Sequence, residues 1–172
     1  DLFLFFPVRG MAYGSQPLTS YNLGTGKWQR VWDNVKLLLA FTLVWSMMVC
    51  LLMMILTEPV VRLVVGDGPM VDYAVPMVRL SFVVFFVATV QFASQHTLQA
   101  MNRPVLTFWI GISRTLVLLV PFIWLLPRLL TNHADMGVFL AQPATDVVVG
   151  TVTVIILFKL LQNYKNIQNN KV

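Results

Sequence analysis

Residues 34–57 read NVKLLLAFTLVWSMMVCLLMMILT, an apolar stretch whose only charged residue is Lys36. An α-helix rises about 1.5 Å per residue, so about 20 apolar residues cross the hydrocarbon core of a bilayer, which is about 30 Å thick. The stretch exceeds that length and lacks the alternation typical of a membrane barrel strand. A helix also satisfies its own backbone hydrogen bonds within lipid. The stretch is therefore predicted to be a transmembrane helix.

Three further stretches have similar length and polarity, at residues 73–100, 104–130 and 136–161. Over all 172 residues, 58% are hydrophobic and only 11% are charged, and the mean hydropathy is +0.76. A soluble domain of this size has too little interior to bury so much apolar surface, so lipid must cover it. We therefore predict an all-α integral membrane protein, a polytopic helical bundle.

The segments between the predicted helices differ in charge. The predicted loop 22–33 and the predicted tail 162–172 are rich in basic residues, whereas the predicted loop 58–72 carries three acidic residues. The positive-inside rule places the basic segments in the cytoplasm and the acidic loop outside the cell. The net charge of +5 then reports orientation in the membrane, and no nucleic-acid partner is predicted.

The first residues are also apolar. Asp1 is followed directly by LFLFF, with no basic segment before it of the kind that opens a signal peptide. Residues 1–21 are therefore predicted to be the rear part of another transmembrane helix. We expect the sequence to be a C-terminal fragment, whose partner would be the missing N-terminal half of the same polypeptide.

Among the charged residues inside the predicted spans three stand out, namely Arg79, Arg114 and Asp146. A charge at the bilayer centre costs at least about 2.5–3.5 kcal/mol, so each needs a reason to be there. Arg114 and Asp146 each lie about ten residues, or about 15 Å, from the turn that begins their helix. Because the two helices are consecutive and antiparallel, these depths match. The spacing predicts an intramembrane Arg114–Asp146 ion pair, with packing and proton or cation binding as alternative roles for the acid.

Softer polar residues form a stripe on the helix predicted at 73–100. Gln91, Ser94 and Gln95 share one face by the i, i+3, i+4 rule. Together with Arg79 they are candidates to line a cavity, although such a stripe also suits hydrogen bonds between helices. The sequence shows no nucleotide-binding loop, zinc signature or catalytic triad, so neither an enzyme, a metal site nor a cofactor is predicted.

Several motifs resemble those of the multidrug and toxic-compound extrusion (MATE) family. Residues 14–26, GSQPLTSYNLGTG, resemble its pattern G-x-Q-P-[IL]-x-S-Y-N-x-G-A, and residues 99–103 resemble its Q-A-x-G-[RK] turn. Ser113 and Arg114 resemble its S-R-Q motif. Residues 137–146, GVFLAQPATD, resemble G-V-[WF]-x-A-x-P-x-[SA]-D. The motifs occur in the family's order and extend over nearly the whole chain.

The resemblance implies part of the C-terminal six-helix lobe of a MATE-type transporter, from late helix eight to helix twelve. It implies a multi-pass plasma-membrane antiporter that exports drugs or organic cations in exchange for protons or sodium. Some members carry a coupling aspartate on their tenth helix, where this chain has Gln91 and no acid, so that role is not transferred. The chain alone is expected to be inactive.

Three other classes of membrane protein are compatible with parts of the sequence. A lipid-linked oligosaccharide flippase of related architecture would need a more cationic cavity to bind a pyrophosphate. A membrane-embedded enzyme for lipid headgroups would need catalytic groups that converge at one leaflet. An accessory subunit would need no buried charge. The antiporter explains most of the motifs and is the preferred prediction.

Overall fold

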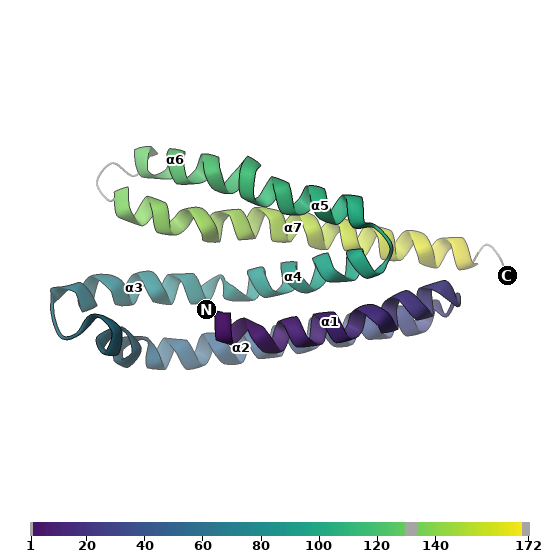
Figure 1. Ribbon diagram of the computed structural model, residues 1–172, viewed down its shortest axis with the longest axis horizontal. Helices are drawn as coiled ribbons and strands as arrows, with labels where there is room; N and C mark the ends of the chain where they lie inside the picture. The colour runs from purple at the N-terminus through teal and green to yellow at the C-terminus, as the bar shows by residue number, and fades with distance from the viewer. Residues whose placement is uncertain (1, 130–133, 170–172) are drawn as a thin grey trace.

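The computed structural model describes residues 2–129 and 134–169, and every regular element within them is a helix (Figure 1). In chain order the elements are α1 (Leu2–Gly24), α2 (Trp28–Val65), α3 (Pro69–Val83), α4 (Phe85–Ala100), α5 (Pro104–Ile112), the π-helix η1 (Ser113–Leu119), α6 (Val120–Leu129) and α7 (Ala134–Asn169). Four helical spans are long and apolar enough to cross a membrane. The predicted all-α helical bundle is confirmed.

The helices extend beyond the predicted spans, so the predicted loops were drawn too long. The predicted loop 22–33 shrinks to residues 25–27, and the predicted loop 58–72 shrinks to residues 66–68. The predicted tail 162–172 continues α7 as far as its described end. Lysine, glutamate, glutamine and arginine are good helix formers, so backbone hydrogen bonding continues past the apolar residues. Hydropathy marks the part of a helix that lipid covers, and not the end of the helix.

Two of the predicted spans are not uniform α-helices. The span 73–100 is divided at Val84 into α3 and α4, and the span 104–130 contains η1. Neither interruption contains proline or glycine. Just before Val84, the Ser81 hydroxyl donates to the Met77 carbonyl at 3.1 Å. Such bonding of a serine to the preceding turn often bends a helix.

Tight turns at three positions rely on a left-handed backbone. The φ angle is +70° at Gly26, +80° at Gly66 and +60° at Asn102. Glycine reaches these angles without a Cβ clash, and asparagine tolerates them better than most residues. The Gly66 N–H donates to the Arg62 carbonyl at 2.8 Å and closes the last turn of α2. The turns thus reverse the chain within a few residues.

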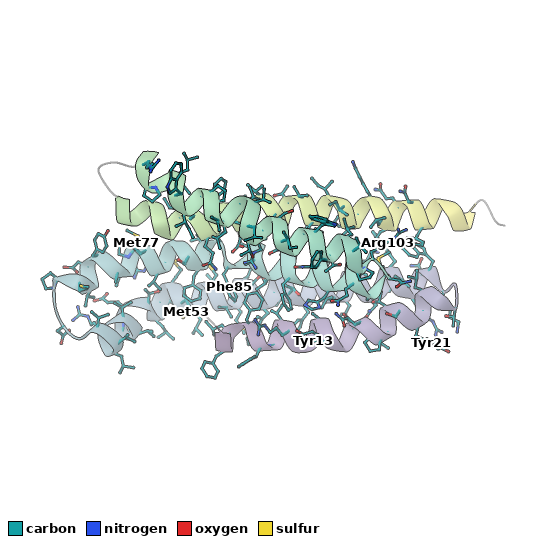
Figure 2. All side chains as sticks on the ribbon, turned by 45° about the horizontal axis from the view of Figure 1, so that its top comes forward. Tyr13, Tyr21, Met53, Met77, Phe85 and Arg103 are labelled. Atoms are coloured by element: carbon teal, nitrogen blue, oxygen red, sulfur yellow. The ribbon has the colours of Figure 1, made fainter. Side chains whose placement is uncertain are left out.

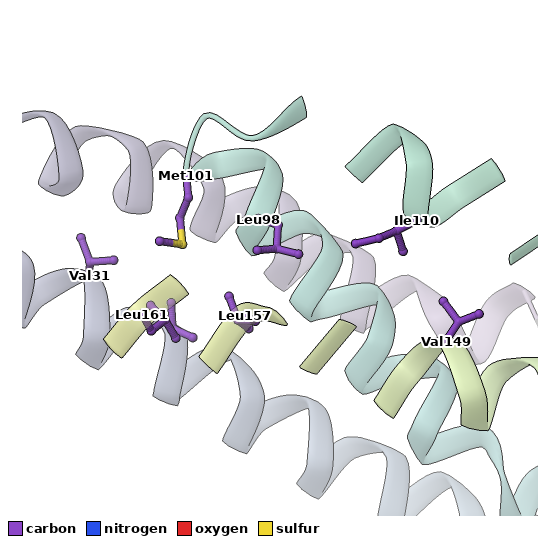
Figure 3. Packing of buried hydrophobic residues seen from close by; sticks show 8 residues of the cluster. Val31, Leu98, Met101, Ile110, Val149, Leu157 and Leu161 are labelled. Carbon is purple, nitrogen blue, oxygen red and sulfur yellow. The ribbon is translucent and has the colours of Figure 1, made fainter. Parts of the chain in front are cut away.

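The helix α4 lies at the centre of the bundle. It packs against α1, α2 and α7, and α7 in turn packs against α6 (Figure 1). At one end of α4, Leu98 and Met101 pack with Val31 of α2 and with Leu157 and Leu161 of α7 (Figure 3). These five side chains are at most 1% exposed. The cluster ties three helices together at the end of the bundle that holds the 25–27 turn.

The outer face of α2 is apolar. Val44, Met47, Leu51 and Ile55 recur at helical spacing and are 60–75% exposed. In water such a stripe would be a large apolar patch, whereas in a bilayer lipid tails cover it. The helix α1 is more polar and lies beside α2 and α4 (Figure 1). It contributes to the site described next.

Candidate functional site

A cavity of about 520 Å³ lies between the helices α1, α4 and α7. Its polar lining comprises Arg9, Ser81, Gln91, Gln95, Arg114, Gln142 and Asp146, and its apolar lining comprises Phe5, Val84, Phe85, Ala88, Phe92 and Pro143. Phe85, one of the lining residues, lies between Met77 and Arg103 along the bundle in Figure 2. The cavity therefore lies inside the bundle, away from both ends.

Arg114 and Asp146 meet at this cavity. The Arg114 Nε and Nη2 atoms donate to Asp146 Oδ1 at 2.9 and 2.7 Å. The Asp146 side chain is 7% exposed, whereas the Arg114 side chain is 38% exposed. The pair therefore has a buried acid and a base that reaches the cavity. The structure places together the two residues that the matched depths predict to be close.

Local irregularities in the backbone position the pair. Arg114 is the second residue of η1, and π-helical turns often occur at functional sites. Asp146 follows Pro143 within α7. Because proline has no N–H, it leaves a carbonyl of the preceding turn without its helical partner and tends to bend the helix. The pair thus joins the π-helix η1 to a position in α7 three residues after a proline.

Arg9 on α1 is a second cation in the cavity. Its guanidinium carbon lies 5.7 Å from the centre of the Phe5 ring and 5.8 Å from that of Phe92. Its buried Nε has no hydrogen-bond partner among the described residues. We did not single out Arg9 from the sequence, because the depth of a helix beginning at the first residues was undefined. The available signal was a single arginine within the otherwise apolar start of a predicted span.

The polar stripe of α4 divides between two environments. Gln91 lines the cavity and is only 2% exposed, and its Nε2 has no partner among the described residues. Gln95 also lines the cavity and donates to the Thr107 carbonyl at 3.2 Å. Ser94 and Arg79, by contrast, are absent from the cavity lining. Two of the four cavity candidates therefore lie elsewhere, since Ser94 is turned into the packing and Arg79 lies on α3, further along the bundle.

A metal site is not formed by the described residues, where no cluster of three histidine, cysteine, aspartate or glutamate side chains occurs. The cavity is instead dominated by nitrogen donors and aromatic rings. Its lining holds two guanidinium groups and one carboxylate. Such a site would bind ligands through hydrogen bonds, ring contacts and charge.

The family model of MatE matches residues 1–125 of the chain. The chain belongs to the MatE family. This match confirms the family resemblance seen in the sequence motifs, and it includes the helices that supply Arg9, Gln91 and Arg114. No curated protein sequence matches the chain.

Solved structures of MATE transporters share the fold. The MATE multidrug transporter DinF-BH, solved in complex with a ligand, is 25% identical, with a TM-score of 0.82 over 92% of this chain. An inward-facing multidrug resistance MATE transporter of the MOP superfamily is 15% identical, with a TM-score of 0.85 over 96% of this chain. The Vibrio cholerae MATE transporter VcmN in the bent form is 15% identical, with a TM-score of 0.81 over 94%. The chain spans only 35–38% of the length of these transporters.

Proposed function

We propose that the chain is part of a secondary antiporter that exports drugs or organic cations across the plasma membrane in exchange for protons or sodium ions. The observation that carries the proposal is the MatE match over residues 1–125, together with a transporter fold. The solved relatives include multidrug transporters, and DinF-BH was solved with a ligand bound. Because the chain spans about a third of their length, we propose that it supplies part of the C-terminal lobe and that export also needs a second lobe.

The cavity offers a surface suited to a flat organic ligand. The rings of Phe5, Phe85 and Phe92 line it, and aromatic faces attract organic cations and stack on planar drugs. Such contacts depend little on the exact shape of the ligand, so they support broad rather than narrow specificity.

Asp146 has a positioning role in this proposal. Both hydrogen bonds from Arg114 end on one of its carboxylate oxygens, so the acid is held by a permanent cation. We therefore assign to Asp146 the role of fixing Arg114 at the cavity wall, and we place the coupling acid outside this chain.

Dye efflux tests the transport proposal. The whole product of the gene is expressed in a pump-deficient bacterium, and ethidium retention is followed while the proton gradient, and then the sodium gradient, is collapsed. We expect gradient-dependent loss of dye, and Asp146→Asn to retain that dependence once efflux is normalised to protein in the membrane. Dye retention equal to the empty vector, with the protein present, would refute drug export and favour the flippase.

Cysteine labelling tests the proposed orientation. Single cysteines replace Lys27, Asp67 and Lys165 in a Cys50→Ser background, which removes the one native thiol of this chain. We expect an impermeant maleimide added to whole cells to label position 67 and to spare positions 27 and 165 until the cells are opened. The reverse pattern would invert the proposed topology.

A further inference from the structure

We propose that the cavity holds a binding site for a small monovalent anion, a halide ion or a carboxylate group, between Arg9, Gln91 and Arg114. The site goes beyond the export of cations proposed above, and it does not depend on it. It follows from the charge of the cavity, the unpaired donors in its wall and its volume.

The charge of the lining is the first step. Arg9 and Arg114 each carry one positive charge, and Asp146 carries one negative charge, so the lining has a net charge of +1. Asp146 pairs with Arg114 through two hydrogen bonds. Arg9 has only the rings of Phe5 and Phe92 beside it among the contacts described for its guanidinium. An uncompensated charge at membrane depth is costly, and one bound monovalent anion would neutralise the lining.

The unpaired donors are the second step. Gln91 is only 2% exposed, and its Nε2 has no partner among the described residues. The Arg9 Nε is likewise buried and unpaired. A buried donor without a partner loses the hydrogen bond that it makes to water in the unfolded chain. A halide or a carboxylate accepts such bonds without bringing donors of its own, whereas an organic cation would leave both donors unpaired.

The size and charge together select the ligand. The cavity of about 520 Å³ holds a halide ion with part of its water shell, since water occupies about 30 Å³ per molecule in the liquid. It also accommodates a carboxylate on a small organic group. A pyrophosphate fits the charge poorly, because it carries more than one negative charge and would face the Asp146 carboxylate. A neutral water molecule would pair the donors but leave the charge of Arg9 uncompensated.

Bromide binding to the purified gene product tests the site. Sodium bromide replaces sodium isethionate, whose anion is neither a halide nor a carboxylate, at constant ionic strength, and the thermal unfolding midpoint is measured in detergent. A ligand that binds only the folded protein raises this midpoint in a saturable way. We expect saturable stabilisation of the wild type. Crystals soaked in bromide should show an anomalous peak bounded by Arg9 and Gln91.

Four variants separate this site from general salt effects. Arg9→Gln and Gln91→Leu should each raise the half-saturating bromide concentration about tenfold, as expected for losing one hydrogen bond to an anion. Arg9→Lys keeps the charge and should bind more tightly than Arg9→Gln. Arg128→Gln is the matched control, because Arg128 also lies over a ring, that of Trp124 at 3.5 Å, but does not line the cavity. It should bind bromide as the wild type does.

The ligand class follows from which salt stabilises the protein. Saturable stabilisation by bromide alone assigns the site to halides, and stabilisation by sodium formate that competes with bromide assigns it to carboxylates. The proposal is wrong if bromide and formate give no saturable effect, if Arg9→Gln and Gln91→Leu leave it unchanged, or if pyrophosphate binds more tightly than bromide. Because the measurement uses no transport, a failed dye-efflux assay leaves its result unaffected.

Discussion

Removing Arg114 should destabilise the protein more than removing Asp146. Two unit charges separated by the 2.7 Å between Arg114 Nη2 and Asp146 Oδ1 attract by about 6 kcal/mol at an effective dielectric constant of about 20. Because the Arg114 side chain is 38% exposed, solvent in the cavity screens part of this attraction, and we take about half, or about 3 kcal/mol. Arg114→Gln strands a buried carboxylate and should lower the free energy of unfolding by about 3–5 kcal/mol.

Asp146→Asn should cost less, about 1–3 kcal/mol, because asparagine keeps an acceptor for Arg114 and the freed cation reaches the cavity. The double variant strands no charge, so it should be more stable than Arg114→Gln alone, with a coupling energy of about 3 kcal/mol, equal to the screened attraction. Unfolding in mixed SDS micelles, followed by tryptophan fluorescence, measures all four proteins. Arg128→Gln combined with Asp146→Asn is the control and should be additive. A coupling energy below about 0.5 kcal/mol would refute the pairing, since additive changes indicate independent sites.

Three substitutions test other parts of the structure by the same unfolding assay. Gly137→Ala should lower the free energy of unfolding by about 1–3 kcal/mol, because a Cβ there would lie 2.6 Å from the backbone nitrogen of Pro127. A variant as stable as the wild type would show that the α6 and α7 backbones are further apart. Trp45→Phe should cost about 1 kcal/mol by removing the 2.9 Å hydrogen bond from Trp45 Nε1 to the Leu4 carbonyl, and an unchanged midpoint would contradict this contact. Asn102→Gly should stay within about 0.5 kcal/mol of the wild type, whereas Asn102→Val should lower the free energy of unfolding by about 1–2 kcal/mol, because the φ angle at this position is +60°. Equal stability of the two variants would argue against a left-handed turn.

The membrane spans could be predicted because bilayer thickness sets a length that any crossing helix must reach. The similar depths of Arg114 and Asp146 could be predicted in the same way. Each residue lies about ten residues from the start of its helix, and the two antiparallel helices start at opposite faces of the membrane, so both residues lie near its middle. A hydropathy profile, however, does not report where the backbone hydrogen-bond pattern of a helix changes. The interruption at Val84 and the π-helix at 113–119 contain neither proline nor glycine, so no helix-breaking residue within them marked their positions.

The composition of the cavity was only partly predictable. Helical spacing identifies which residues share a face, and it grouped Gln91 with Gln95, which do line the cavity. It also grouped Ser94 with them, but Ser94 is buried against other helices. Residues at positions i, i+3 and i+4 spread over a broad arc of the helix surface, so they do not all face the same cavity. Arg9 was missed because its position depends on how α1 lies against α4. That arrangement is set by contacts distant in the sequence.

The interruption at Val84 also means that two separate helix segments, α3 and α4, form this part of the cavity wall. Ser81, on the α3 side, Val84 itself and Phe85, on the α4 side, all line it. One continuous helix would tilt as a rod, and any push from within the cavity would reach the 66–68 turn. Because a single residue stands outside the helical pattern, a change in its dihedral angles would alter the angle between α4 and α3, which packs against α2. We therefore expect motion at the centre of the bundle to reach the end at which α2 and α3 meet only weakly.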